Sequence, residues 1–284
     1  MKCFYHNDMD GRCAASIVAE YYENFDRENY IEVDYIQPLP LDIITKGELV
    51  LFVDYSFKSD TVWQLKEVLK KTQYVIWIDH HTSSIKLLKE QPELKDLTTG
   101  IIQDKISGAA LTYMYFYRCE FEDCPEYIQL VSDYDCWIYK FGDRTTYFKL
   151  GLEAEPFDAL DDIWKYLYNF PQDIESIINK GKIIKQFIDQ DNEYYLSHFG
   201  YESKLLGHKC YVVNKKSNSW IFGDKINQYP FVVVWVFTGD KYSYSLFSTD
   251  PTVDCSKIAE QLGGGGHKGA AGFSSDTLLV KKVN

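Results

Sequence analysis

Short apolar runs that alternate with helical segments limit the fold of this chain more than any other feature. The expected strands are residues 2–6, 30–37, 48–56 and 74–81. The expected helices between and after them are residues 12–25, 59–71, 107–118 and 125–137. Because several of these strands are almost continuously apolar, we expect a parallel sheet whose two faces are both covered by helices.

A long helix, followed by a strand-rich part, divides the chain into two. Residues 173–199 form one helical segment with an apolar stripe, which indicates a connector. The elements expected after Gly200 are strands at 208–214, 230–248 and 269–283 and a helix at 254–262. The sequence TGDK predicts a hairpin within the second of these strands. The expected parts are an α/β parallel-sheet domain at 1–170, a helical connector at 171–199 and a smaller α+β domain at 200–284.

The composition is that of a globular protein, with 45% hydrophobic and 25% charged residues. No apolar run reaches membrane-spanning length, and the opening residues MKCFYHNDMDG do not resemble a signal peptide. We therefore expect a soluble cytoplasmic protein with no membrane partner. The seven cysteines include no C-x-x-C pair, which favours reduced thiols packed as small apolar side chains over a zinc site.

The net charge of −12 is concentrated in the first 200 residues, which hold 20 basic and 35 acidic side chains. Residues 201–284 hold 10 lysines and 7 acidic residues. A protein that wraps long nucleic acid usually has a basic face. The acidic part suits cation binding instead, so any nucleic-acid substrate is expected to be short.

Polar side chains follow three of the expected strands at the points where those strands end. They are His6, Asp8 and Asp10 after the first strand, Asp54 after the third, and Asp79, His80 and His81 after the fourth. The carboxyl ends of parallel strands meet at one edge of a sheet, where ligands bind. The helix at 125–137 contains Asp133 and Asp135 near its end, and this pair could reach the same edge.

So many carboxylates at one edge cannot all stay ionised unless cations lie between them. Carboxylate and imidazole ligands together suit Mn²⁺, Zn²⁺ or Fe²⁺, whereas oxygen ligands alone would favour Mg²⁺ or Ca²⁺. The number of ligands fits two metals, and a pair about 3.5–4 Å apart suits in-line displacement at phosphorus. Each residue alone could be a turn, a cap or a surface group, but those explanations would have to hold at several strand ends together.

The stretch AEQLGGGGHKGAAGF places four consecutive glycines before two basic side chains. Backbone without Cβ atoms lets an anion approach N–H groups closely, and the basic side chains would add charge-assisted donors. A flexible linker is the alternative, although linkers do not usually lie between a helix and a strand. The expected anion-binding residues are Gly264, Gly265, Gly266, His267 and Lys268.

Four motifs, HNDMDG, FVDYS, IDHH and VSDYDCW, resemble those of the DHH phosphoesterase superfamily. The stretch IAEQLGGGGHKGAAGF resembles the motif of its DHHA1 companion domain, and the motifs span nearly the whole chain in the family's order. The opening motif and the compact size look closest to the nanoRNase-type oligoribonucleases. The resemblance implies a DHH domain at 1–170, a DHHA1 domain at 200–284 and two Mn²⁺ ions, for which Mg²⁺ or another divalent cation could substitute.

The resemblance also implies roles for individual residues. The metal ligands that it implies are Asp8, Asp10, Asp54, His80 and Asp133, with Asp54 bridging the two ions. Asp79 would orient a neighbouring ligand, a support that metal sites commonly need. The implied substrate contacts are His81 at the reacting phosphate and Gly265, Gly266 and His267 at a terminal phosphate or the backbone. Asp54 and His81 would be the catalytic residues.

Two positions depart from the family pattern. Many relatives have a histidine four residues before the first motif aspartate, where this chain has Phe4, so His6 is the expected replacement as a metal ligand. Many DHHA1 domains have an arginine in the strand that reads SLFS here. Phe247 would replace that phosphate contact by stacking on a base.

These expectations describe a manganese-dependent phosphodiesterase that hydrolyses short oligonucleotides to nucleoside 5′-monophosphates. A cyclic dinucleotide or 3′-phosphoadenosine 5′-phosphate is the alternative substrate for the same chemistry. A RecJ-like exonuclease acting on single-stranded DNA is a weaker alternative, because no additional oligonucleotide-binding domain is evident. A metal-free scaffold is the third alternative, but such a protein would be expected to have lost metal ligands, and almost every motif residue is present here. A homodimer is expected by analogy alone.

Overall fold

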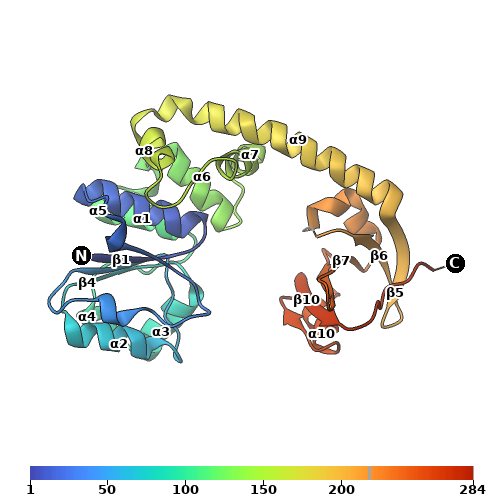
Figure 1. The fold of residues 1–284 in the computed structure, drawn as a ribbon, viewed down its shortest axis with the longest axis horizontal. Coiled ribbons are helices and arrows are strands. Elements are labelled where there is room, and N and C mark those ends of the chain that lie inside the picture. Colours follow the sequence, from blue (N-terminus) through green and yellow to red (C-terminus); the bar gives the residue numbers. More distant parts are fainter. Residues whose placement is uncertain (217–218, 284) are drawn as a thin grey trace. The chain divides into compact units, whose positions relative to one another are not determined.

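The computed structural model describes residues 1–216 and 219–283, which form two compact units. The first unit is Met1–Lys185 and the second is Gln186–Asn284. Helix α9 (Ile174–Phe199) belongs to the first unit in its first half and to the second unit thereafter (Figure 1). No helix among the described residues is long and apolar enough to cross a membrane.

The first unit is built on a parallel sheet of four short strands, which confirms the predicted fold class. The strands are β1 (Lys2–His6), β2 (Tyr30–Val33), β3 (Val50–Val53) and β4 (Val75–Ile78). They pair in the order β2-β1-β3-β4, and every pair is parallel. Because the strands run in one direction, the carboxyl ends of β1, β3 and β4 lie along a single edge.

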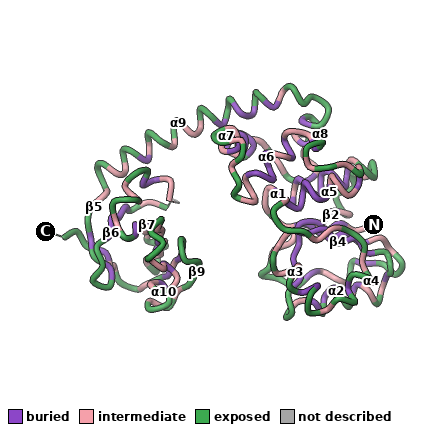
Figure 2. Tube along the Cα trace, turned by 180° about the vertical axis from the view of Figure 1, so that it is seen from behind, coloured by how far each residue is buried: buried purple, intermediate pink, exposed green. Residues whose placement is uncertain are grey.

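Helices cover both faces of this sheet, and the strands are buried between them (Figures 1 and 2). One face is covered by α1 (Met9–Tyr22), α5 (Gly108–Tyr117), α6 (Glu126–Asp135), α7 (Asp143–Leu152), α8 (Asp162–Asn169) and the start of α9. The other face is covered by α2 (Val62–Lys71), α3 (Thr82–Glu90) and α4 (Leu94–Leu97). Short 3-10 helices are η1 (Arg27–Asn29), η2 (Leu41–Ile43), η3 (Phe121–Asp123) and η4 (Pro171–Asp173). Strand side chains alternate between the two cores, so Tyr5 faces one set of helices and Phe4 the other.

Helices α7 and α9 touch backbone to backbone within the first unit. A Cβ atom on Gly151 would lie 1.9 Å from the carbonyl oxygen of Ile177. A Cβ atom on Gly181 would lie 1.7 Å from the carbonyl oxygen of Tyr147. These two glycines therefore allow the first half of α9 to pack closely on the helical layer.

The second unit is a mixed six-stranded sheet with helices, in agreement with the α+β expectation. Its strands are β5 (Gly200–Leu205), β6 (His208–Asn214), β7 (Phe231–Phe237), β8 (Tyr242–Phe247), β9 (Gly265–Gly266) and β10 (Ala270–Ser275). Its helices are η5 (Ser219–Gln228) and α10 (Cys255–Glu260). The strand order is β5-β6-β7-β8-β10-β9, and only β6 and β7 pair in parallel among these strands.

Two details of the second unit differ from the prediction. Strand β5 forms at Gly200–Leu205, where no strand is expected from the sequence. Strand β10 ends at Ser275, although a strand is expected to continue to residue 283. It ends there because the hydroxyl of Ser275 accepts from the N–H of Thr277 at 3.2 Å and turns the chain, after which Val280 packs into the core. The seven cysteines are unpaired, and five of them are buried.

Candidate functional site

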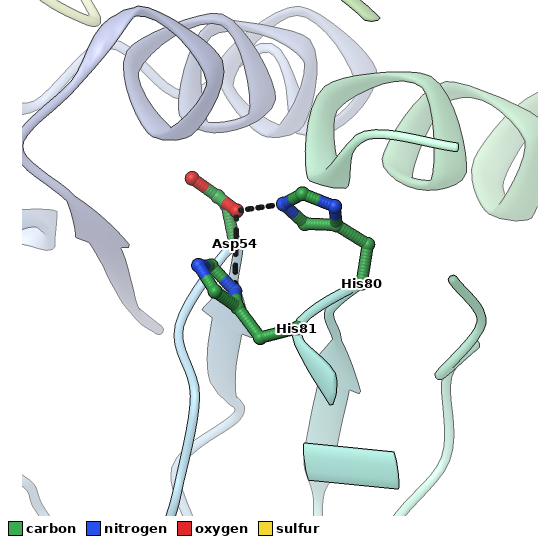
Figure 3. A group of neighbouring side chains, drawn as sticks. All are labelled: Asp54, His80 and His81. Carbon is green, nitrogen blue, oxygen red and sulfur yellow. Dashed lines mark ion pairs between the residues drawn. The ribbon is translucent and has the colours of Figure 1, made fainter. Parts of the chain in front are cut away.

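The ends of β1, β3 and β4 bring acidic and imidazole side chains together at one edge of the first sheet. His80 Nε2 lies 3.3 Å from Asp54 Oδ1, and His81 Nδ1 lies 3.9 Å from the same oxygen (Figure 3). His6 Nδ1 lies 4.0 Å from the other carboxylate oxygen of Asp54. Asp54, which directly follows β3, is therefore the centre of this cluster.

The carboxylate of Asp54 is buried, and no N–H or O–H group of the described residues donates to it. Its side chain is 1% exposed, and both of its oxygens lack a hydrogen-bond partner. Burial raises the pKa of Asp54 well above its usual range, and the carboxylates of Asp10 and Asp8 raise it further. An unpaired buried carboxylate is costly, whereas a cation between these groups would compensate the charge. The donor set therefore fits a metal site.

The backbone at Asp54 is held in an unusual conformation. Its φ angle is 53°, in the left-handed region that residues with a Cβ atom rarely adopt. Gly108, the first residue of α5, packs directly against it, since a Cβ atom on this glycine would lie 2.5 Å from Asp54 Cβ. The start of α5 thus holds the Asp54 side chain at the sheet edge.

Asp10 connects the cluster to the same helix. Its carboxylate accepts from the backbone N–H of Gly108 at 2.6 Å and from that of Ala109 at 3.0 Å, at the positive end of α5. Asp10 Oδ2 also lies 3.9 Å from His80 Nε2. Burial raises the pKa of Asp10, which the nearby His80 opposes. Two fixed N–H donors therefore orient this carboxylate toward the cluster.

His6 and Asp8 form a pair beside Asp54. His6 Nδ1 lies 2.7 Å from Asp8 Oδ2, while Asp8 Oδ1 accepts from the N–H of Gly11 at 2.9 Å. Burial would raise the pKa of Asp8, but the hydrogen bond and charge of His6 lower it to about 2. Phe4, the position where a histidine is common in relatives, is fully buried and stacks on Phe52 with ring centroids 5.2 Å apart. His6 is thus the imidazole that β1 brings to the cluster.

His81 is held by a buried carboxylate. Asp79 is fully buried, and its Oδ1 lies 2.7 Å from His81 Nδ1. The hydroxyl of Ser84 donates to the other oxygen of Asp79. The His81 side chain remains 33% exposed. Asp79 therefore positions the imidazole, and the ring reaches solvent at the edge of the cluster.

Asp133, an expected metal ligand, accepts hydrogen bonds from the segment that follows α6. Its carboxylate accepts from the backbone N–H groups of Lys140 at 2.7 Å and Phe141 at 3.2 Å. It also accepts from the hydroxyl of Thr145. Asp133 is buried and anchors the segment that follows α6, so both of its oxygens are occupied.

Asp135 reaches the cluster instead. Asp135 Oδ2 lies 3.2 Å from His80 Nε2, and this buried oxygen accepts no hydrogen bond from the described residues. Side chains two residues apart on a helix point roughly 200° apart, so Asp133 and Asp135 cannot face the same edge. The sequence pair therefore divides into one anchor and one candidate ligand.

The neighbouring charges of the cluster shift the pKa values of Asp135 and His80. Burial raises the pKa of Asp135 to about 7, Asp10 adds to the rise, and His80 opposes it. Burial alone would lower the pKa of His80, but a hydrogen bond with Cys136 and the charges of Asp10 and Asp135 raise it to about 10. Among the described residues, the groups able to hold a metal are His6, Asp8 and Asp54; Asp54, His80 and His81; and His80, Asp135 and Cys136.

The glycine-rich stretch forms the end of α10 and an exposed hairpin in the second unit. The N–H groups of Gly263 and Gly264 donate to carbonyl groups of α10. This arrangement ends the helix with Gly263 at a φ of 77°. The N–H of His267 donates to the carbonyl of Ala270 at 2.7 Å and closes the hairpin. The backbone N–H groups of Gly264 and His267 therefore already donate to carbonyl groups of the chain.

The rest of the predicted anion site remains accessible. Gly265 and Gly266 form β9, and both are exposed. His267 and Lys268 are exposed in the turn that follows. Phe247 packs partly buried against an apolar core on one face of the second sheet.

Tyr35 lies beside the first-unit cluster, and no sequence motif marks it. Its ring centroid lies 5.0 Å from that of His6 and 6.4 Å from that of His81. The ring stacks on Tyr55, and its hydroxyl accepts from the N–H of Ser56 at 3.1 Å. A tyrosine in an irregular segment after β2 gives no periodic signal, so only the structure identifies it as a support for the imidazoles.

Comparison with known proteins finds a family model that matches part of the first unit. Residues 3–134 match the model described as the DHH family, N-terminal domain. An uncharacterized protein of Acanthamoeba polyphaga mimivirus is 27% identical over 257 residues, covering 84% of this chain. The match covers 56% of that protein, so this chain spans little more than half the length of its curated relative.

Two solved structures share the fold. A pGpG-specific phosphodiesterase, PggH from Vibrio cholerae, aligns with a TM-score of 0.57 at 12% identity and covers 97% of this chain and 94% of its own. The DHH domain of a member of a ribosomal-protein family aligns with a TM-score of 0.53 at 14% identity, covering 95% of this chain and 81% of its own. At these identities the similarity is one of fold.

Proposed function

We propose that this chain is a member of the DHH phosphoesterase superfamily, whose N-terminal domain model matches residues 3–134, and that it is a two-metal phosphodiesterase that hydrolyses short oligonucleotides to nucleoside 5′-monophosphates. The observation that carries the proposal is the carboxylate of Asp54, buried without a donor and surrounded by three imidazoles and further carboxylates. An unpaired group of this kind at a sheet edge is typical of a cation site.

The proposed ligands form two sets that share Asp54. His6, Asp8 and Asp54 hold one cation, since their ligand atoms lie within 4.8 Å of one another. The second set is Asp10, Asp54, His80 and Asp135. Mixed carboxylate and imidazole donors favour Mn²⁺, with Mg²⁺ or another divalent cation as a substitute. Divalent cations bound here supply Lewis acidity to a phosphodiester.

The residues of the chain then have distinct tasks. His81 presents Nε2 to the substrate's phosphate group, because Asp79 occupies its Nδ1. Asp79 keeps the ring in that orientation. In the second unit, the exposed side chains of His267 and Lys268, with the backbone of Gly265 and Gly266, would bind a phosphate group.

A short substrate is favoured by the acidic charge of residues 1–200, which disfavours long nucleic acid. The fold neighbour from Vibrio cholerae is specific for pGpG, which is also a short nucleotide. A cyclic dinucleotide or 3′-phosphoadenosine 5′-phosphate is the second candidate, because the same groups would serve it.

The test is a competition among substrates. The protein is incubated with Mn²⁺ and equal amounts of a labelled RNA dinucleotide, a longer RNA, a longer single-stranded DNA and cyclic di-AMP. We expect the dinucleotide to disappear first and monophosphates to accumulate, with no turnover by Asp54→Asn. First consumption of the cyclic compound or of a long strand would overturn the substrate assignment. Full activity of Asp54→Asn would overturn the site.

A further inference from the structure

The segment 136–141, which follows α6, presents an exposed aromatic surface beside the metal-ligand cluster. Trp137 is 72% exposed, the largest exposed fraction of any aromatic side chain among the described residues. Asp135 contacts His80 at 3.2 Å, and Cys136 Sγ lies within 4.8 Å of the ligand atoms of both. Trp137 comes directly next, so its Cα atom is about 3.8 Å from that of Cys136. The backbone of Trp137 therefore lies next to a candidate ligand of the site.

This segment is held in a fixed conformation. Trp137 has a φ of 55° and Tyr139 a φ of 52°, both in the left-handed region. The carboxylate of Asp133 accepts from the N–H groups of residues 140 and 141, and its carbonyl accepts from those of Ile138 and Tyr139. A strained segment persists only where its surroundings hold it, and such segments concentrate at functional sites. The anchoring by Asp133 thus fixes where the indole is presented.

Two tyrosines fix the indole without covering it. The ring of Tyr134 lies 6.4 Å from that of Trp137 at an interplanar angle of 25°, and the ring of Tyr139 lies 6.0 Å away at 74°. Tyr35, an exposed aromatic side chain near His6 and His81, is 41% exposed, stacks on Tyr55 and accepts a hydrogen bond. Tyr35 is therefore occupied in supporting His6 and His81, whereas Trp137 retains a large accessible surface.

We propose that Trp137 is a stacking platform for a nucleobase of the substrate, and that this base belongs to the nucleotide whose phosphate lies at the His80–Asp135 edge. The inference rests on the proposed function, since it assumes a phosphate at that edge. Stacking on an aromatic ring recognises any base, because every base has a π face. It also provides affinity without positive charge, which suits the acidic first unit. The platform confers binding of nucleotides in general and a preference for purines, whose larger rings overlap more of the indole.

The test measures binding without turnover. Titration calorimetry with Mn²⁺ present compares adenosine 5′-monophosphate with ribose 5-phosphate, which lacks only the base. The wild-type chain binds the nucleotide more tightly. Trp137→Ala weakens binding of the nucleotide about tenfold or more and leaves ribose 5-phosphate unchanged, while Trp137→Phe retains most of the preference.

Two matched controls separate stacking from general damage. Ile138→Ala removes an exposed apolar side chain from the same segment, and Trp63→Ala removes an exposed tryptophan from α2; both bind like the wild type. Equal affinity of the wild type for the two ligands, or an unchanged nucleotide affinity in Trp137→Ala, would overturn the platform. If the base-dependent loss is found but no phosphodiester is hydrolysed in the substrate competition, the platform stands and the proposed function fails.

Discussion

Asp135→Asn should stabilise the metal-free protein above neutral pH, although it removes a candidate ligand. The pKa of Asp135 is raised from 3.8 to about 7 by burial and by Asp10, against the opposing effect of His80. Between these values the unfolded chain is ionised at this position and the folded chain is protonated. The folded state therefore binds more protons, so its stability falls as pH rises through this window.

The size of the effect follows from the shift. Each pH unit within the window costs about 1.36 kcal/mol, so the full window of about three units is worth about 4 kcal/mol. Asparagine does not ionise and escapes this loss. The difference in unfolding free energy between Asp135→Asn and the wild type should therefore change by about 3 kcal/mol, in favour of the variant, between about pH 5 and about pH 8.

The assay is urea unfolding in the presence of a chelator, followed by tryptophan fluorescence. Four of the six tryptophans lie in the first unit, so fluorescence reports mainly on that unit. Added Mn²⁺ should stabilise the wild type in proportion to RT ln(1 + [L]/Kd) and should stabilise the variant much less. If Asp135 is a metal ligand, the variant is therefore the more stable protein without metal and the wild type is the more stable protein with Mn²⁺.

Asp133→Asn is the matched control two residues away. It disturbs hydrogen bonds that Asp133 accepts from two backbone N–H groups and Thr145. It should lower the unfolding free energy by about 1–3 kcal/mol at both pH values. Parallel pH profiles for Asp135→Asn and the wild type, or a gain from Asp133→Asn, would refute the assignment of Asp135 to the charged cluster.

Two further predictions concern glycines. Gly264→Ala should lower the stability of the second unit by about 2 kcal/mol, because its Cβ would lie 2.1 Å from the carbonyl oxygen of Gly272. Gly265→Ala meets nothing within 4 Å and should change thermal unfolding little; equal effects would contradict the hairpin geometry. Gly181→Ala should lower the unfolding free energy by about 3 kcal/mol, because its Cβ would lie 1.7 Å from the carbonyl oxygen of Tyr147. The exposed neighbour substitution Lys182→Ala, compared by urea unfolding, should be nearly neutral, and a neutral Gly181→Ala would show that the two helices do not touch.

The fold of the first unit is predictable because its strands are apolar on both faces, so residue type alone marks β1, β3 and β4. Helices α3, α4, α7 and α8 lie outside the segments expected to be helical. In α7 the sequence DRTTYFKLGL has two threonines and a glycine, which have low helical propensity. Its Gly151 is instead required for contact with α9, a tertiary reason that no local pattern contains.

The candidate site is also predictable from the sequence only in part. Strand ends give the positions of Asp54, His80 and His81, because parallel strands share an edge whatever their detailed packing. The choice between Asp133 and Asp135 depends on the rotation of α6 about its axis, and both residues are acidic. Likewise, the glycine run predicts an anion-binding loop. In the structure, the N–H groups of Gly263 and Gly264 donate to carbonyl groups at the end of α10, and Gly264 packs closely on β10.

The same residues explain how the fold tolerates an edge that is unfavourable without metal. Asp54 is buried, its backbone is in the left-handed region, and its carboxylate has no hydrogen-bond partner. Its position is therefore fixed by the elements that pack against it. The start of α5 packs on it through Gly108, and Asp10 ties that helix to the sheet. These contacts hold the Asp54 side chain at the sheet edge. A ligand that is positioned in advance loses less conformational entropy on binding, so this support should favour metal affinity.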